Sequence, residues 1–231
     1  MKITIAMPCL DKIETQTVKS LIDLERPEGS EISVEFMESS LVYLSRDRLG
    51  VMALEGEADY LLFLDSDMTF APDMLLRLLE DAESGKDIVT ALCFRRRPDY
   101  NPAIWKKLRP GLPGESVVET YDDYPAEDVF EVEACGMATV LIRATVLKDV
   151  FEKEKALFAP IPGYGEDVSF CLRARRAGFS LWCDSRIKVG HIATTIVTED
   201  TFKAYRQKQE EAKNARRSKN SAEDHTQQTG R

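Results

Sequence analysis

Short apolar runs alternate with amphipathic stretches along residues 1–94. The apolar runs predict four strands, at 3–7, 32–36, 60–64 and 87–94. Apolar residues at helical spacing predict three helices between them, at 14–24, at 44–55 and from Pro72 onward. Strands that alternate with helices through short connections predict right-handed crossovers and a mostly parallel sheet.

The pattern becomes irregular between Arg95 and Ser116, a segment rich in proline, arginine and aromatic residues. We expect a long irregular connection there, and loops of this size in compact domains usually serve as lids or binding loops. Arg95, Arg96 and Arg97 form the main positive cluster ahead of the C-terminal tail. These arginines fit either a ligand-binding loop or a solvated turn.

Strand and helix patterns return in the second half of the chain. They predict extended segments at 131–135 and 137–143, helices at 145–154 and 167–177, and short strands at 181–183 and 187–189. Gly136 marks a bend between the two extended segments. Asp167 occupies the expected N-cap of the second helix, and His191 follows the last strand.

Composition and charge narrow the class of protein. With 231 residues, 43% hydrophobic and 31% charged, the chain fits a globular protein with one α/β domain. A net charge of −9 argues against a nucleic-acid binder, and an anionic substrate would need a metal ion or a local basic cluster. The five cysteines include no C-x-x-C pair, which argues against a zinc site and favours a reducing compartment. Because no apolar run is long enough for a signal peptide or a membrane span, we expect a cytoplasmic protein.

The most informative stretch is the apolar strand at 60–64 and the acidic triplet that follows it. Asp65 and Asp67, separated by Ser66, are expected at the carboxyl end of this strand, where open α/β sheets bind ligands. Alternation along the strand directs both carboxylates to one side. Two carboxylates that share a small site repel each other, so a divalent cation is their natural partner. The same residues also fit a solvated acidic turn.

Four other residues are candidates for this site. Glu166 and Asp167 begin a predicted helix, where carboxylates suit the helix dipole, but a carboxylate at the rim of a site also serves as a general base. His191 is able to complete the shell of Mg²⁺ or Mn²⁺, although lone histidines are more often structural. Arg46 is expected to begin the helix after the second strand, where it either reaches a nucleotide and its phosphates or remains an exposed surface residue.

In their order and spacing, six segments resemble the inverting family 2 glycosyltransferases of the GT-A fold. They are MPCL, SRD, FLDSD, ACGMATVLIR, YGEDVSFCLRARRAG and VGH, and they span about residues 1–195. The resemblance implies a nucleotide-sugar donor linked to UDP or GDP, a divalent metal (Mn²⁺ or Mg²⁺), and a glycan or other acceptor with a hydroxyl group.

The resemblance also implies a role for each candidate residue. Asp167 corresponds to the catalytic base, and Glu166 helps to bind the acceptor. The implied metal-binding residues are Asp67, His191 and Asp65, and Asp65 also lies near the donor ribose. The implied donor-binding residues are Pro8, Glu38, Arg46, Asp65, Ser66 and Gly136, with Pro8, Glu38 and Arg46 in the nucleoside pocket and Gly136 where donor and acceptor meet.

The chain departs from the family pattern in three respects. Cys9 follows Pro8 in a segment where the family often has asparagine, and Glu38 stands where an aspartate is usual. The chain contains neither a Q-x-x-R-W motif nor a membrane helix, which argues against a processive polymer synthase.

The resemblance implies a GT-A glycosyltransferase domain at residues 1–200, with a nucleotide-binding half at 1–94 and an acceptor half at 95–200. The expected architecture is a mostly parallel central sheet flanked by helices, with a small second antiparallel element. The expected reaction is metal-dependent, non-processive and inverting. Residues 201–231 are expected to form a charged tail, partly helical or disordered. The tail is either solvated, or it contacts an anionic membrane surface or a second copy of the chain.

Two other functions fit parts of the sequence. FLDSDMT resembles the D-x-D-x-T signature of haloacid-dehalogenase-type phosphatases, in which Asp65 would be a nucleophile, although no downstream acidic motif of that family follows. A non-catalytic module on the same fold, which binds a nucleotide sugar or a glycan, is the second alternative.

Overall fold

The computed structural model describes residues 1–97, 99–110, 116–194, 199, 203 and 206–207. The chain divides into a compact unit, Met1–Ile192, and a second unit, Ala193–Arg231. In the second unit, Glu199 and Lys203 are helical and form an ion pair (Oε1 to Nζ, 2.8 Å). Most of the tail expected at 201–231 lies outside the described residues, so its contacts remain a prediction.

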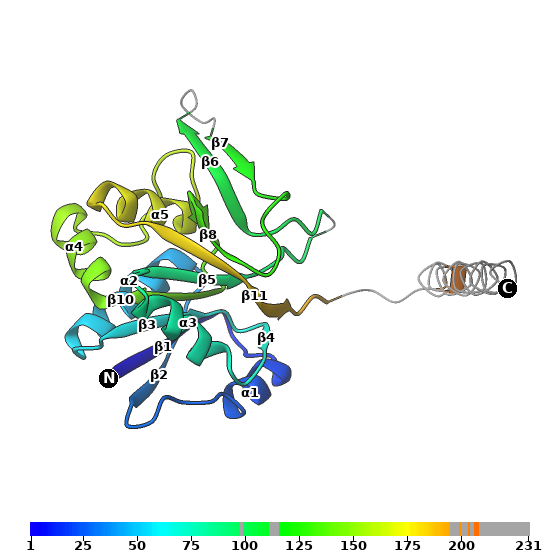
Figure 1. Ribbon diagram of the computed structural model, residues 1–231, viewed down its shortest axis with the longest axis horizontal. Coiled ribbons are helices and arrows are strands. Elements are labelled where there is room, and N and C mark those ends of the chain that lie inside the picture. Colours follow the sequence, from blue (N-terminus) through cyan, green and yellow to red (C-terminus); the bar gives the residue numbers. More distant parts are fainter. Residues whose placement is uncertain (98, 111–115, 195–198, 200–202, 204–205, 208–231) are drawn as a thin grey trace, which may run out of the picture. The chain divides into compact units, whose positions relative to one another are not determined.

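The compact unit is built on one large mixed sheet (Figure 1). Its strands are β1 (Lys2–Cys9), β2 (Glu31–Glu38), β3 (Tyr60–Leu64), β4 (Met68–Phe70), β5 (Ile88–Leu92), β8 (Val129–Val132), β10 (Thr139–Arg143) and β11 (Leu181–His191). The order is β2–β1–β3–β10–β5–β11–β4, with β8 also paired to β11. β1 is parallel to β2 and to β3, and β5 is parallel to β11, whereas β10 is antiparallel to both of its neighbours. The mostly parallel sheet is thus confirmed, with an antiparallel strand inserted at its centre.

A smaller antiparallel sheet lies beyond the main one. It consists of β6 (Ile104–Pro110), β7 (Ser116–Thr120) and β9 (Ala134–Cys135), in the order β7–β6–β9. The irregular connection expected at 95–116 is therefore wrong at 104–110 and at 116, and residues 98 and 111–115 lie outside the described part. Its proline and arginine content concealed a strand that pairs with the nearby β7 and, through the buried residues Ile104 and Trp105, with the more distant β9.

The five expected helices are all present, and they form two layers around the main sheet. They are α1 (Thr15–Ile22), α2 (Val42–Glu55), α3 (Met74–Glu83), α4 (Ala144–Glu154) and α5 (Glu166–Ala177). Helices α2, α4 and α5 cover one face, and α3, with α1 near the β4 edge, covers the other. None of the helices in the described part of the chain is long and apolar enough to cross a membrane.

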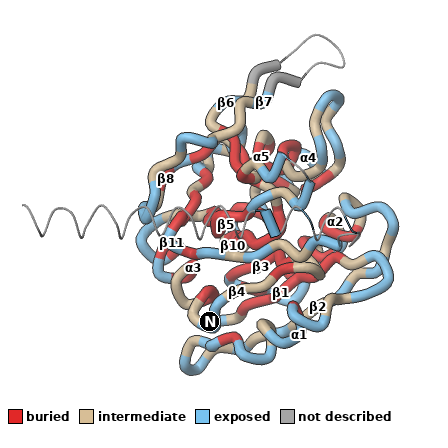
Figure 2. Tube along the Cα trace, turned by 90° about the vertical axis from the view of Figure 1, so that its right-hand side faces the viewer, coloured by how far each residue is buried: buried red, intermediate tan, exposed pale blue. Residues whose placement is uncertain are grey.

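Strand β3 shows how both faces of the sheet are buried. Leu61 and Phe63 belong to the core on the side of α2, α4 and α5, whereas Leu62 belongs to the core under α3. Phe63 meets Phe158 edge to face at 5.1 Å between ring centroids, and Phe158 stacks on Phe170 of α5 at 4.6 Å. In Figure 2 the central strands are red and the outer loops mostly pale blue. Because burial of each such side chain contributes about 1.5–3 kcal/mol, the core holds the end of β3 firmly in place.

Candidate active site

The carboxyl ends of three neighbouring parallel strands meet at one edge of the main sheet. β1 and β2 end side by side at the paired residues Cys9 and Glu38, and β3 ends directly before Asp65. This edge surrounds a cavity of about 320 Å³, which we call the strand-end cavity. Its lining residues are Pro8, Cys9, Leu10, Ser39, Ser40, Val42, Arg46, Asp65, Ser66, Asp67, Arg96 and His191.

Asp65, Ser66 and Asp67 form the turn between β3 and β4. The strand predicted at 60–64 is confirmed, but the alternation expected to direct both carboxylates to one side does not apply, because the three residues lie in a turn after Leu64. Both carboxylates nevertheless line the same cavity. The backbone fixes both ends of the turn, since Asp65 N donates to Ala138 O (3.0 Å) and Asp67 O accepts from the N–H of the residue after β11 (2.8 Å).

The buried side chain of Arg46 joins Asp65 to Glu166. Its Nη2 donates to Asp65 Oδ1 at 2.8 Å, and its Nη1 donates to Glu166 Oε1 at 2.5 Å. Burial acts against the charge of Arg46, but the two carboxylates raise its pKa. α2 begins at Val42, so Arg46 lies in the second turn and not at the helix start as expected. Its guanidinium therefore binds two carboxylates and does not form part of a helix N-terminal phosphate site.

The start of α5 carries the two acidic residues of the predicted catalytic pair. The expected N-cap at Asp167 is wrong: Gly165 is the N-cap and the helix begins at Glu166. Asp167 Oδ1 accepts a hydrogen bond from Val168 N (2.7 Å). Burial, and then the charge of Glu166, raise the pKa of Asp167, which makes its carboxylate a better proton acceptor. Neither acidic residue lines the strand-end cavity, but Arg46 connects Glu166 to it.

The pairing of β4 with β11 brings His191 beside Asp67. His191 lies opposite Met68 in this antiparallel pair, one residue after Asp67. The distance from His191 Nε2 to Asp67 Oδ1 is 3.4 Å, and His191 Nδ1 lies 2.9 Å from the carbonyl oxygen of Phe94. The hydrogen bond with Asp67 raises the pKa of His191 to about 10. The two short strands expected at 181–183 and 187–189 are a single strand, β11, with an irregularity between Asp184 and Lys188.

The donor atoms of Asp67 and His191 fit a divalent cation. Their separation of 3.4 Å is close to that of neighbouring ligands around one ion with bonds of about 2.0–2.3 Å. A histidine whose Nδ1–H is donated to the Phe94 carbonyl presents the lone pair of Nε2 to a metal. Within the described residues, no three His, Cys, Asp or Glu side chains are grouped as a metal site. Water and substrate oxygens would therefore provide most of the shell.

The guanidinium of Arg96 also binds Asp67, a role that the sequence did not predict. Burial acts to raise the pKa of Asp67, but the hydrogen bond and charge of His191 and the charge of Arg96 outweigh burial and lower this pKa. In the sequence, only the cluster of three arginines at 95–97 indicated that Arg96 belongs to a binding site. Ser39 and Ser40 were missed as well, and their position after β2, equivalent to that of the acidic turn after β3, is the signal that identifies them.

Besides Glu166 and Asp167, two predicted donor-binding residues lie outside the lining of the strand-end cavity. Glu38 is exposed at the end of β2, directly before the cavity residue Ser39. Gly136 N donates to Ala103 O (2.8 Å), and a Cβ added at Gly136 would lie 3.3 Å from Ala103 Cβ. In the structure, Gly136 thus permits a close approach between two backbone segments.

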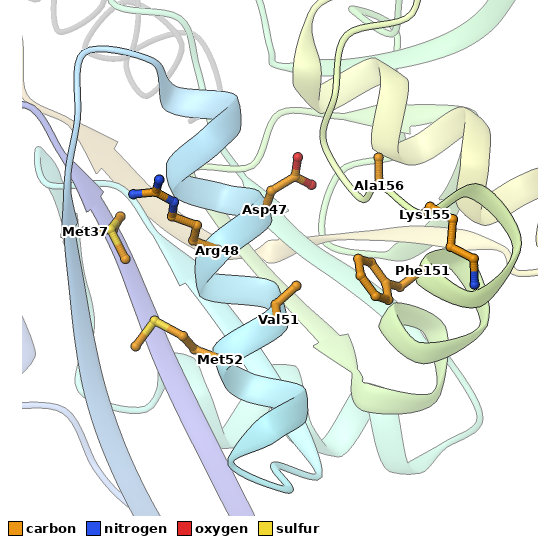
Figure 3. Close-up of a pocket in the computed structure, with 8 residues that line it drawn as sticks. All are labelled: Met37, Asp47, Arg48, Val51, Met52, Phe151, Lys155 and Ala156. Atoms are coloured by element: carbon orange, nitrogen blue, oxygen red, sulfur yellow. The ribbon is translucent and has the colours of Figure 1, made fainter.

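An apolar cavity of about 430 Å³ lies between α2, α4 and the end of β2 (Figure 3). Val51 and Phe151 point toward each other, and Met37 and Met52 lie on the other side of α2. Its one carboxylate, Asp47, accepts hydrogen bonds from two backbone N–H groups after α4 (2.8 and 2.7 Å) and so has a structural role. The chemistry-bearing groups gather at the strand-end cavity instead.

Comparison with known proteins agrees with this architecture. Residues 49–151 match the model of glycosyl transferase family 2. The crystal structure of A197 from STIV is similar, with a TM-score of 0.60 and 18% identity over 83% of this chain and 86% of that chain. S. aureus TarS (residues 1–349), crystallised in complex with UDP-GlcNAc, has a TM-score of 0.53 and 15% identity over 86% of this chain and 60% of that chain. No curated protein matches the sequence.

The fold predicted from the sequence is therefore confirmed as GT-A. The family match and the fold together support a glycosyltransferase. They do not favour the phosphatase alternative, and Asp65, its expected nucleophile, is engaged by Arg46.

Proposed function

We propose that this protein transfers a sugar from a UDP- or GDP-linked donor to an acceptor hydroxyl with inversion, without processive synthesis. The observation that carries the proposal is the ion-pair bridge from Asp65 through Arg46 to Glu166. It connects the acidic turn at the strand-end cavity to the helix start that bears Asp167. The family match supports the reaction class, and the UDP-GlcNAc complex of the similar TarS structure supports a nucleotide-sugar donor.

The donor is proposed to lie in the strand-end cavity. Its nucleoside would contact Pro8 and the end of β2 near Glu38, with the ribose near Asp65 and Ser66. Arg46 holds the carboxylate of Asp65 in place, because a nearly buried guanidinium with two charged partners has little freedom to move. Gly136 is proposed to lie where donor and acceptor meet.

A divalent cation, Mn²⁺ or Mg²⁺, would be held by Asp67 and His191, with Asp65 nearby. When bound, such an ion neutralises the charge that develops on the departing nucleoside diphosphate. Phe94 supports this site through His191, since its carbonyl fixes the ring orientation.

Asp167 is proposed as the general base. Inversion needs one carboxylate opposite the leaving group to accept the proton of the attacking hydroxyl, and the raised pKa of Asp167 suits this task. Glu166, oriented by Arg46, is proposed to position the acceptor.

Calorimetric titration with UDP and GDP, with and without Mn²⁺, tests the donor and metal sites. We expect one nucleotide to bind in a metal-dependent way and Asp67→Asn to abolish that dependence. The matched control is Asp73→Asn, because Asp73 is half-exposed and pairs with Arg77 at 4.0 Å outside the site. Nucleotide binding that is indifferent to both Mn²⁺ and Asp67→Asn would refute the proposal.

Assays of donor hydrolysis and transfer separate the remaining alternatives. A sugar product that depends on Asp167 identifies a transferase. Metal-dependent nucleotide binding without turnover of any nucleotide sugar would instead identify a binding module, and release of phosphate from simple phosphoesters would identify a phosphatase.

A further inference from the structure

A cavity of about 400 Å³ beside the strand-end cavity is lined mainly by arginines. Its lining residues are Arg95, Arg96, Arg97, Asp99 and His191, and we call it the arginine cavity. Arg96 and His191 also line the strand-end cavity, so the two cavities share a wall. In a chain of net charge −9, three guanidinium groups around one cavity are a concentrated positive site.

The positive charge of this cavity is incompletely neutralised. Arg95 pairs with Asp99 at 3.4 Å and lies over the ring of Trp105. Arg96 pairs with Asp67. Arg97 has no ion-pair partner in the part of the chain that the structure describes, and its side chain is exposed. One guanidinium is thus available for an external anion.

The arginines belong to a segment that is fixed at its base. Arg95 N donates to Asn101 O (3.0 Å), and Phe94 forms an antiparallel bridge with Pro102. The carbonyl oxygen of Phe94 contacts His191, so the same base also supports the proposed metal site. This anchoring favours the binding-loop interpretation of the arginine cluster over the solvated turn, because it orders the loop before any ligand binds.

The same segment presents an exposed aromatic ring. Tyr100 is 62% exposed and has a left-handed φ of 45°. A bulky residue at positive φ is unfavourable, and such conformations concentrate at ligand sites. The backbone N–H of Tyr100 donates to Arg97 O (2.7 Å), so the backbones of these two residues form one tight turn.

We propose that the arginine cavity binds the phosphate or carboxylate group of an anionic acceptor, so that the acceptor is a charged and not a neutral glycan or alcohol. This inference rests on the proposed function. The donor diphosphate is expected at Asp67 and His191 in the strand-end cavity, and the arginine cavity lies on the other side of the wall formed by Arg96 and His191.

Arg96 links the occupation of the two cavities. Without a cation, Arg96 is a counter-charge of Asp67. A divalent ion bound to Asp67 would neutralise the charge of this carboxylate in place of Arg96. The guanidinium of Arg96 would then be available, beside that of Arg97, to bind an anion. We therefore expect anion binding in the arginine cavity to strengthen when the metal site is loaded, and by linkage the anion to strengthen metal binding by the same factor.

The test uses the full chain saturated with Mg²⁺ and the nucleotide that binds, titrated with glycerol phosphate by calorimetry. We expect a second site, occupied together with the nucleotide, and an affinity weakened about fivefold or more by Arg97→Ala, since one charge-assisted contact is lost. Arg77→Ala, which removes the same charge from a partly exposed position on α3 outside both cavities, should leave the affinity unchanged. Omission of Mg²⁺ should weaken glycerol phosphate binding in the wild type but not in Arg96→Ala.

Transfer assays provide the second readout. With a phosphorylated acceptor, Arg97→Ala should raise KM and leave kcat unchanged, and with the unphosphorylated form of that acceptor it should change neither.

Four results would overturn the inference. Competition between glycerol phosphate and the nucleotide would show that the arginines serve the donor diphosphate, and equal affinities of Arg97→Ala and Arg77→Ala would show that the cavity binds no anion. Nucleotide binding without a second anion site refutes this inference alone. Absence of metal-dependent nucleotide binding refutes the proposed function, and this inference with it.

Discussion

Replacement of Arg46 by methionine is expected to destabilise the compact unit by about 3 kcal/mol. Arg46 is 4% exposed, and its guanidinium is shared between Asp65 and Glu166 at 2.8 and 2.5 Å. Removing one partner of a fully buried ion pair costs about 3–5 kcal/mol, because the other charge remains buried and unpaired. The carboxylates keep side-chain exposures of 26% and 22%, so we take the lower end of this range. Methionine retains an apolar stem, which limits the loss of packing.

Urea denaturation followed by circular dichroism measures this change in the free energy of unfolding. Arg175→Met is the matched control, because Arg175 pairs with Glu133 at 3.1 Å with side chains 37% and 33% exposed. Such a pair contributes less than about 1 kcal/mol.

Acidification provides a second arm of the same experiment. In Arg46→Met the carboxylate of Asp65 loses its cation, so its pKa in the folded state, which burial already raises, rises further. Raised carboxyl pKa values favour the folded state at low pH, and that contribution is lost as the pH rises through them. The loss of unfolding free energy caused by Arg46→Met should therefore become smaller below about pH 5. If Arg46→Met lowers the free energy of unfolding no more than Arg175→Met does, or by an amount independent of pH, Arg46 does not stabilise the protein through its two carboxylate partners.

Three further predictions concern single sites. Asp167→Asn should lower the transfer rate by about 10²–10⁴ while leaving donor affinity unchanged, and normal turnover would exclude Asp167 as the base. Burial, and then the hydrogen bond and charge of Asp184, raise the pKa of Asp81 from 3.8 to about 6. The contribution of Asp81 to the free energy of unfolding is therefore fully present below its unfolded-state pKa of 3.8, and it is lost as the pH rises through about 6. In the wild type, the urea concentration at the midpoint of unfolding should fall as the pH rises over this range, and Asp81→Asn should remove that fall. The same dependence on pH in the variant as in the wild type would contradict the assignment to Asp81. A Cβ at Gly190 would clash with Thr69 Oγ1, so Gly190→Ala should lower the free energy of unfolding, measured by urea denaturation, by about 1–3 kcal/mol. Adding Thr69→Ala to this variant should restore part of the lost stability. If it does not, the clash with Thr69 is not the cause.

Patterns local in the chain predicted most of the elements. The apolar residues of β3 and β5 and the stripe of α3 are set by burial, which acts on neighbouring residues and is therefore visible as periodicity. The acidic turn was found because Asp65 and Asp67 directly follow such a strand. His191 was found from its position after a strand, and the β4–β11 pairing explains why it meets Asp67.

Features that depend on distant pairing were not predictable in this way. The partners of Arg46 lie 19 and 120 residues away, and no local pattern indicates that one arginine joins them. β6 was concealed by its proline and arginine content, and its pairing with both β7 and β9 compensates for a poor strand composition. The binding of Arg96 to Asp67 likewise results from the fold of the segment after β5.

The insertion of β10 at the centre of the sheet has a consequence for synthesis on the ribosome. β10 supplies the shared partner of β3 and β5, yet it is translated only after residue 138. Until then, the nascent chain carries two mostly apolar strands, Tyr60–Leu64 and Ile88–Leu92, whose residues are all buried in the folded protein and whose edges are open toward the missing strand. Open apolar edges of this kind favour aggregation. A truncated product that ends before β10 should therefore depend on chaperones, whereas one that continues through Ile192 has the strand that closes the gap.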